Sequence, residues 1–248
     1  MVGAVKIEDD GKRWEFTLRD GLLFHDGEKV LARDCVASIR RWAARDAVAG
    51  IVMKVTDELS APDDRTIRFR LKKPFPRLAY ALGKTSYPMC ATMPERFANF
   101  DPFKQIGELD GSGPFRFKAD ERVSGSRAIY EKFDRYVPRP DGTRGSTTGP
   151  KIVNFDRVEC ITIPDEGTAA GALQAGGMDW WEIPTDDLEP VLLNVGHVRE
   201  ARRDVGMCQS RAEPWRRRNT GEDHMRTIWV SGFFTGHATG LKLEFITR

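Results

Sequence analysis

The clearest pattern in the chain is an alternation of apolar and polar residues over residues 13–19, RWEFTLR. Trp14, Phe16 and Leu18 fall on one face, and charged or hydroxyl side chains fall on the other. This period of two is typical of a half-buried strand. Residues 66–71, TIRFRL, repeat it. The pattern therefore predicts a strand at each place.

A helical period follows the first strand. In residues 32–45, ARDCVASIRRWAAR, apolar side chains recur at Cys35, Ile39 and Trp42. This i, i+4, i+7 spacing predicts an amphipathic helix. Leu31 occupies the place where Ser or Asp would cap better, so the start of the helix is weakly specified.

Shorter elements are expected in the middle of the chain. Residues 76–82 and 93–100 are suited to single turns of helix. Phe115 and Phe117 alternate with charged residues as in a strand, and residues 127–131 are the expected antiparallel partner. Residues 137–150 are rich in Pro, Gly, Ser and Thr, which predicts a loop.

A strand, a helix and a second strand are predicted next. Residues 156–163 and 178–184 are the strands. Thr168 is the expected N-terminal cap of the helix TAAGALQAG, and Gly176 is its expected C-terminal cap. Strand, helix and strand within about 25 residues form a crossover unit, which favours an α/β sheet. After about residue 200 no sustained period remains.

Composition excludes several classes of protein. The 248 residues are 40% hydrophobic and 31% charged, as expected of a globular chain with a real core. A net charge of +2 gives no support for a nucleic-acid partner. No apolar run is long enough to predict a transmembrane helix, and the first residues do not have the pattern of a signal peptide.

Cysteine and histidine positions give no metal-site pattern. No C-x-x-C pair exists, four cysteines allow three disulfide pairings, and buried free thiols are the favoured interpretation. We expect no metal and no cofactor. The residues concerned are Cys35, Cys90, Cys160, Cys208, His197, His224 and His237.

The segment Gly111-Ser112-Gly113-Pro114 is the first candidate for chemistry. It lacks the lysine of a phosphate-binding loop, and Pro114 removes a backbone donor that an anion would need. It is followed by a strand, whereas a nucleophile elbow needs a helix. The glycines instead suit a sharp turn between structural units.

Two other features have a functional and a structural interpretation. His25-Asp26 could be a general-base pair, but no nucleophile is linked to it, and a turn at Asp26-Gly27 explains the stretch better. The arginine run at 199–218 could bind phosphates, but a solvated basic segment is the favoured interpretation. We therefore expect no catalytic residue.

Trp180-Trp181-Glu182 is the last candidate. Neighbours in a strand face opposite sides, so one tryptophan can enter the core while the other reaches a surface or cleft. The indole offers a broad apolar face and one N–H donor, which suits flat or peptide-like ligands. Packing of both indoles in the core is the alternative.

Several blocks, in their order, resemble the family 5 extracellular solute-binding proteins, the dipeptide- and oligopeptide-binding subunits of bacterial ABC importers. The resemblance covers roughly residues 10–190. The blocks are WEFTLRDGLLFHDGEKVLARDCVASIRRW, DDRTIRFRLKKPFP, GSGPFRF, YEKFDRYVPR and DRVECITIPDEGTAAGALQAGGMDWWEIP.

The resemblance implies a mixed α+β chain with part of a type II periplasmic-binding-protein fold. Residues 1–110 would be the extra α+β domain inserted in the first lobe, residues 111–200 part of that α/β lobe, and residues 201–248 an atypical tail that is disordered or frame-shifted. The second lobe would be absent.

The function implied is solute capture without catalysis. The solute would be a peptide or a similar small polar molecule, and the partners would be ABC permease subunits in the inner membrane. Location would be periplasmic. Ser112, Gly113, Trp180, Trp181 and Glu182 are the expected ligand-binding residues. A truncated chain that binds nothing is one alternative, and a hydrolase using His25 or a cysteine is the other.

The chain departs from the family in several respects. Family members are about twice as long, and the start of the first lobe is absent here together with the second lobe. Gly177 stands where the family commonly has an acidic residue. Beyond about residue 200 the resemblance ends in an arginine-rich and then glycine-rich sequence.

An altered reading frame or a misplaced gene boundary would explain that abrupt change. This hypothesis predicts that the encoding DNA, translated in another frame near the end of the resemblance, continues a family-like sequence. Sequencing that DNA on an independent template is the measurement, and the absence of such a continuation contradicts the hypothesis.

Overall fold

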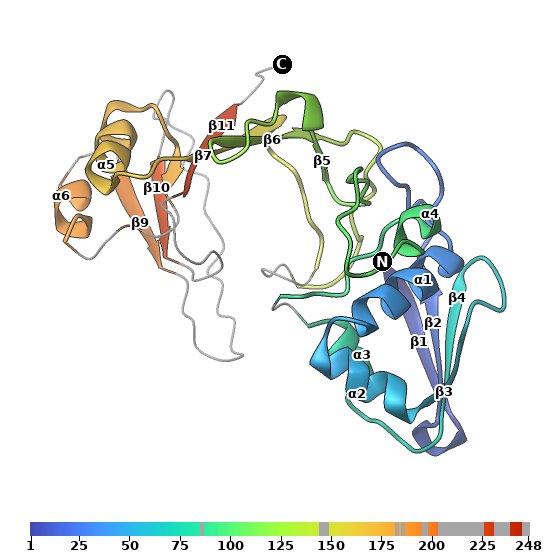
Figure 1. Cartoon of the computed structure of the whole chain (residues 1–248). Coiled ribbons are helices and arrows are strands. Elements are labelled where there is room, and N and C mark those ends of the chain that lie inside the picture. Colours follow the sequence, from blue (N-terminus) through green and yellow to red (C-terminus); the bar gives the residue numbers. More distant parts are fainter. Residues whose placement is uncertain are drawn as a thin grey trace. The chain divides into compact units, whose positions relative to one another are not determined.

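The computed structural model describes residues 1–84, 87–143, 149–181, 184, 187–194, 198–202, 226–230 and 239–244. Two compact units divide the chain. Unit 1 comprises residues 1–116 and 133–151, and unit 2 comprises residues 117–132 and 152–248 (Figure 1).

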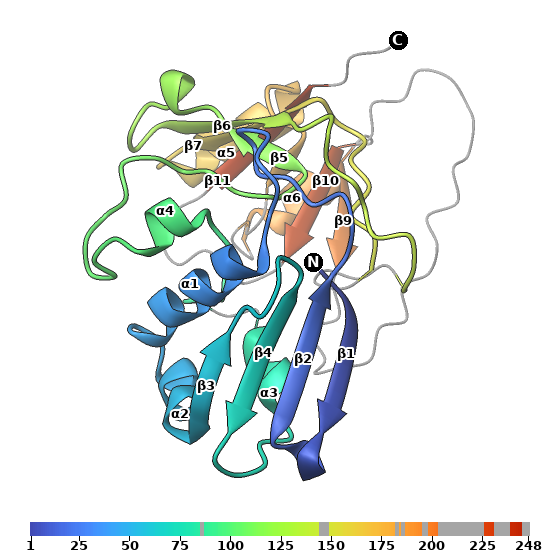
Figure 2. The ribbon, with the colours of Figure 1, turned by 90° about the vertical axis from the view of Figure 1, so that its right-hand side faces the viewer.

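Unit 1 contains a four-stranded sheet with helices on it. The strand order is β1-β2-β4-β3, and each pair of neighbours is antiparallel (Figure 2). The strands are β1 (Val2–Glu8), β2 (Arg13–Leu18), β3 (Thr56–Ser60) and β4 (Thr66–Leu71). The helices are α1 (Ala32–Ala43), α2 (Ala47–Val55), α3 (Leu78–Leu82) and α4 (Glu95–Ala98), with a 3-10 turn η1 (Asp9–Gly11).

The alternation in β2 and β4 sets the core of unit 1, as the sequence predicts. Trp14, Phe16 and Leu18 are each at most 5% exposed, and they share a buried cluster with Ile67 and Phe69 of β4. Their polar neighbours in both strands are less buried. Period-two patterning therefore determines which face of the sheet is buried.

Helix α1 covers that face. Cys35, Val36 and Ile39 are buried in the same cluster as the two strands, which confirms the predicted helix. Leu31 offers no capping side chain, and Asp34 compensates because its carboxylate accepts a hydrogen bond from the Leu31 N–H at 2.8 Å. The start of α1 is thus held from inside the helix.

The sequence pattern did not predict helix α2, although Asp46 before it is a residue type that commonly caps helices. The Asp46 side chain is buried and accepts from the Ala49 N–H at 3.0 Å, and Lys84 forms an ion pair with it. Burial would raise the pKa of Asp46, but the ion pair and the backbone N–H donors outweigh it and lower the pKa. The Asp46 side chain therefore links the N-terminus of α2 to Lys84, which lies just beyond α3.

The second sheet lies mainly in unit 2. Its strand order is β5-β6-β7-β11-β8-β10-β9. The strands are β5 (Phe115–Phe117), β6 (Arg127–Lys132), β7 (Arg157–Thr162), β8 (Trp180–Trp181), β9 (Val198–Arg202), β10 (Arg226–Val230) and β11 (Thr239–Glu244). Between them lie η2 (Ala119–Glu121), α5 (Glu166–Ala175) and α6 (Glu189–Leu193).

The predicted crossover unit is present. Strand β11 pairs antiparallel with both β7 and β8, so β7 and β8 run parallel to each other on either side of it. Helix α5 connects them, and Gly176 ends it in the left-handed region with φ 86° as predicted. The predicted cap was wrong. Asp165 is the N-terminal cap instead, and its carboxylate accepts a hydrogen bond from the Thr168 N–H at 2.7 Å. Both Asp and Thr can cap a helix, and Asp165 precedes Thr168 in the chain.

The sequence pattern predicted no strand after about residue 200, yet β10 and β11 both lie beyond it. Each is short, and six residues or fewer give too few alternations to stand out from the surrounding glycine and threonine. Within the described ranges, no helix has the length and apolar character needed to cross a membrane.

Asp46→Ala should lower the free energy of unfolding by about 1–3 kcal/mol, because it removes a helix cap and leaves Lys84 without its buried partner. Asp46→Asn should cost less, since asparagine keeps the cap. Because folding lowers the pKa of Asp46, its contribution is present above about pH 4 and is lost as the pH falls further.

Urea unfolding followed by circular dichroism is the measurement. Asp57→Ala is the matched control, because Asp57 forms an exposed ion pair with Arg70, and it should change stability by about 0.5 kcal/mol or less. Equal losses of stability in Asp46→Ala and Asp57→Ala would contradict the role of Asp46 as a helix cap and as the ion-pair partner of Lys84.

Candidate functional site

A tight turn follows β2 and carries His25. The Phe24 N–H donates to the Glu28 carbonyl at 2.8 Å, and the Glu28 N–H donates to the Asp26 carboxylate at 2.8 Å. Gly27 has φ +96°, a conformation that favours glycine, and a Cβ there would lie 2.6 Å from Arg135 Nη1. The predicted Asp26-Gly27 turn is confirmed.

The imidazole of His25 spans the Gly111-Ser112-Gly113 segment. The Gly111 N–H points at His25 Nδ1 at 3.4 Å, and His25 Nε2 lies 3.0 Å from the Gly113 carbonyl oxygen. The backbone N–H of His25 is shared between the Gly111 carbonyl at 2.9 Å and the Asp110 carboxylate at 3.0 Å. Two segments more than 80 residues apart in sequence are therefore joined around one side chain.

Arg96 of α4 fastens the same two segments from the outside. Its guanidinium contacts Asp26 at 2.5 Å and Glu28 at 2.9 Å on the His25 turn. It also lies 3.4 Å from Asp110, which precedes the glycine-serine segment. One cation thus faces three carboxylates. We call Arg96, Asp26, Glu28 and Asp110 the arginine clamp.

Two carboxylates of the clamp have opposite pKa shifts. Burial would raise the pKa of Asp26, but hydrogen bonds from the Glu28 N–H and from Arg96 outweigh it and lower the pKa. Burial raises the pKa of Asp110, and the negative charge of Asp26 adds to the increase. Of these two carboxyl groups, Asp110 is therefore the one that takes up a proton first on acidification.

His25 and Asp26 do not form a general-base pair. The partners of the two imidazole nitrogens are Gly111 and Gly113, while the Asp26 carboxylate is held by the Glu28 N–H and Arg96. A catalytic dyad needs the carboxylate on the imidazole and a nucleophile on its other nitrogen. The arrangement is that of a structural turn.

Ser112 is the one residue of its segment that His25 does not hold. It is half-buried, and among the described residues neither its hydroxyl nor its backbone groups have a hydrogen-bond partner. His25 engages the N–H and carbonyl of Gly111 and the carbonyl of Gly113, while the Gly113 N–H has no hydrogen-bond partner among the described residues. The turn therefore presents one set of available donors and acceptors.

The tryptophan pair lies on β8 in unit 2. Trp181 is fully buried in a cluster with Leu173, Met178 and Leu192, and Trp180 on the opposite face is half-buried. This is the alternation expected of neighbours in a strand. Glu182 lies outside the described residues. The ligand contacts expected of all three stay predictions.

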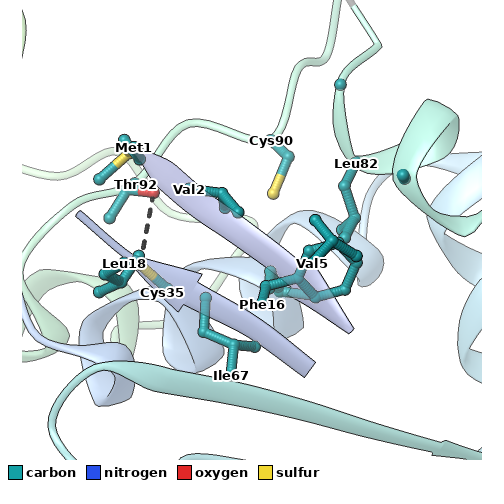
Figure 3. A pocket seen from close by; sticks show the side chains of 13 residues that line it. Met1, Val2, Val5, Phe16, Leu18, Cys35, Ile67, Leu82, Cys90 and Thr92 are labelled. Carbon is teal, nitrogen blue, oxygen red and sulfur yellow. Dashed lines mark hydrogen bonds between the residues drawn. The ribbon is translucent and has the colours of Figure 1, made fainter. Parts of the chain in front are cut away.

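Unit 1 also has a partly open cavity of about 320 Å³ between the sheet, α1 and α3 (Figure 3). Its walls are almost entirely apolar, with the thiols of Cys35 and Cys90 and the Thr92 hydroxyl as exceptions. Cys35 Sγ and Thr92 Oγ1 are 3.9 Å apart. None of the side chains that line the cavity is charged, so none of them could anchor a peptide terminus.

No pattern in the sequence predicted this cavity or the proximity of its two thiols. Cys35, Cys90 and Cys160 are free thiols, and Cys208 lies outside the described residues. Burial raises the pKa of Cys35 to about 11. Burial, with the nearby Cys35, raises the pKa of Cys90 to about 12. Both are therefore protonated thiols at neutral pH.

Within the described residues, no group of three or more His, Cys, Asp or Glu side chains is arranged to hold a metal ion. His197, His224 and His237 fall outside the described residues, so the structure gives no positions for them.

Comparison with known proteins finds one family. The family described as bacterial extracellular solute-binding proteins, family 5 Middle, matches residues 3–208. The "Probable peptide ABC transporter periplasmic-binding protein y4tO" of Sinorhizobium fredii is 39% identical over 197 residues. That alignment covers 77% of this chain and 36% of the relative. The chain thus spans about a third of the length of the relatives it matches.

Solved structures support the same fold. The periplasmic binding protein DppA of Helicobacter pylori, in complex with the peptide STSA, gives a TM-score of 0.60 at 23% identity, covering 79% of this chain and 40% of that one. NikZ of Campylobacter jejuni, in complex with Ni(L-His), gives 0.60 at 19% identity, covering 79% and 36%. The predicted mixed α/β fold, as part of a periplasmic-binding-protein fold, is confirmed.

Cys35 and Cys90 should react slowly with iodoacetamide. At pH 8 a thiol with a pKa near 11 or 12 has a thiolate fraction on the order of 10²–10³ times smaller than an ordinary cysteine. Peptide-level mass spectrometry of the native chain measures the rate, which should rise steeply with pH. The urea-unfolded chain is the control. Equal rates in both states would contradict the burial of these thiols.

Proposed function

Because the chain belongs to the bacterial extracellular solute-binding proteins of family 5, we propose that it is part of a receptor that captures a small solute for an ABC importer. The proposed solute is a peptide or a similar small polar molecule. The observation that carries the proposal is the match over residues 3–208, together with 39% identity to a relative named as peptide-binding. The proposed site of action is the periplasm, and the proposed partners are ABC permease subunits.

The mechanism we propose is capture without bond chemistry. The family consists of binding proteins, and the one histidine with an acidic neighbour in the described part of the chain is committed to a turn. Ser112 and Gly113 are the proposed solute contacts of unit 1, because the Ser112 hydroxyl and amide have no other partner among the described residues. Trp180 and Glu182 are the proposed contacts of unit 2, and the fully buried side chain of Trp181 is proposed to hold β8 in place behind them.

We also propose a division of the chain. Residues 1–110 would be the inserted domain of the first lobe, residues 111–200 part of that lobe, and residues 201–248 an atypical tail. The passage of the chain out of unit 1 at residue 116 supports a boundary close to the glycine-serine turn.

The purified chain should bind a short polar peptide weakly and saturably. Isothermal titration calorimetry with trialanine, the nickel–histidine complex and a neutral disaccharide is the measurement. We expect heat from the peptide and a dissociation constant in the micromolar range or weaker, because high affinity needs a solute enclosed on most sides.

Ser112→Ala should weaken that binding about threefold to tenfold, the cost of one hydrogen bond. Ser124→Ala is the matched control, because Ser124 is an exposed serine beside Gly125 in another turn, and it should leave the affinity unchanged. Heat from none of the three solutes would overturn binding and favour the truncated, inactive alternative. Cleaved peptide after the titration would favour the hydrolase.

A further inference from the structure

We propose that His25 is a positioning residue that shapes the Gly111-Ser112-Gly113 turn for solute contact. The inference rests on the proposed function and adds a role for a side chain that solute capture alone does not require. His25 holds the two glycines of the turn, and Ser112 between them is left to meet the solute.

The contacts assign a protonation state to the ring. Nδ1 faces the Gly111 N–H and must accept, so it carries no proton. Nε2 faces the Gly113 carbonyl oxygen at 3.0 Å and must donate, so it carries the proton. His25 is therefore the neutral Nε2–H tautomer, and its two nitrogens match the two ends of a three-residue turn.

The ring is held in place from three sides. The Phe133 ring meets it edge-on, with centroids 5.1 Å apart and planes at 70°. The His25 N–H donates to Asp110 and Gly111, which fixes the backbone that carries the ring. The arginine clamp ties Asp26, next to His25, to Asp110, next to Gly111. A side chain fixed in this way can impose a shape on the turn instead of following it.

The polar groups of the turn fall into two sets, one bonded to His25 and one available to a solute. The polar groups of Gly111 and Gly113 that meet His25 are consumed inside the protein, so a solute cannot use them. The amide, hydroxyl and carbonyl of Ser112, together with the Gly113 N–H, are the groups left over among the described residues of the turn. They suit a solute that offers both hydrogen-bond donors and acceptors, such as a peptide unit.

Charge on the ring would undo the fit. A second proton on Nδ1 would point at the Gly111 N–H, and two donors would then face each other. The charged groups around His25 are Asp26 and Glu28 of its own turn, Asp110 of the glycine-serine segment and Arg96 of α4. The uncharged ring is therefore the form of His25 that fits the turn.

Three substitutions at His25 test the proposal. His25→Gln keeps a donor near the Nε2 position, His25→Asn keeps an acceptor near the Nδ1 position, and His25→Ala keeps neither. Trialanine binding by calorimetry should be about tenfold weaker in His25→Ala, the cost of two hydrogen bonds. The two conservative variants should lie between it and the natural chain.

A readout without solute distinguishes this proposal from the proposed function. In nitrogen-15 NMR spectra of the whole chain, the His25 ring should give the Nε2–H pattern. His25→Ala should shift the amide signals of Gly111, Ser112 and Gly113 together, and it should speed hydrogen exchange at Gly111. Far-UV circular dichroism of each variant reports whether the fold is retained.

Each result decides one of the two proposals. An Nδ1–H ring, or Gly111 exchange and trialanine affinity both unchanged in folded His25→Ala, overturns the positioning role. A natural chain that binds no solute while His25→Ala loosens the turn overturns the proposed function and limits His25 to a structural role. Weaker binding with a loosened turn, and partial rescue by the conservative variants, supports both.

Discussion

The buried face of β2 is the constraint on which unit 1 depends. Trp14, Phe16 and Leu18 point to the same side and are nearly inaccessible to solvent, while β1 and β4 pair on either edge of the strand. A shift of one residue would turn all three outward, so the register is strongly specified. The turn with His25 follows β2 after a few residues and inherits this fixed starting point. The position of the imidazole is therefore anchored in the core.

Segments with a long, strictly periodic pattern were predicted correctly. Segments with little difference between a polar and an apolar face were missed. The alternation around Phe16 and the helical spacing from Cys35 to Trp42 each have one buried and one exposed face, and both elements are present. Helix α2 is apolar along most of its length and contains Gly50, so it has little periodic contrast. Strand β1 was missed because most of it is exposed at an edge of the sheet.

The sequence predicted the residues of the candidate site better than their relationship. Ser112 and Gly113 could be selected because a Gly-Ser-Gly turn before a strand stands out. His25 was assigned correctly to a turn, but its attachment to Gly113, 88 positions later, depends on tertiary packing that no local pattern encodes. Arg96 gave no signal at all, since a single arginine near a short helix is common. Contacts between residues so far apart in the sequence can be identified only from the folded structure.

The apolar cavity beside Cys35 and Cys90 has a consequence for the packing energy of unit 1. It is a partly open space of about 320 Å³ between the sheet and its helices, so the atoms that line it have no packing partners on one side. These atoms lack dispersion contacts that an atom in a close-packed interior makes. Unit 1 is therefore less tightly packed on this side of its sheet than the strict alternation of β2 suggests.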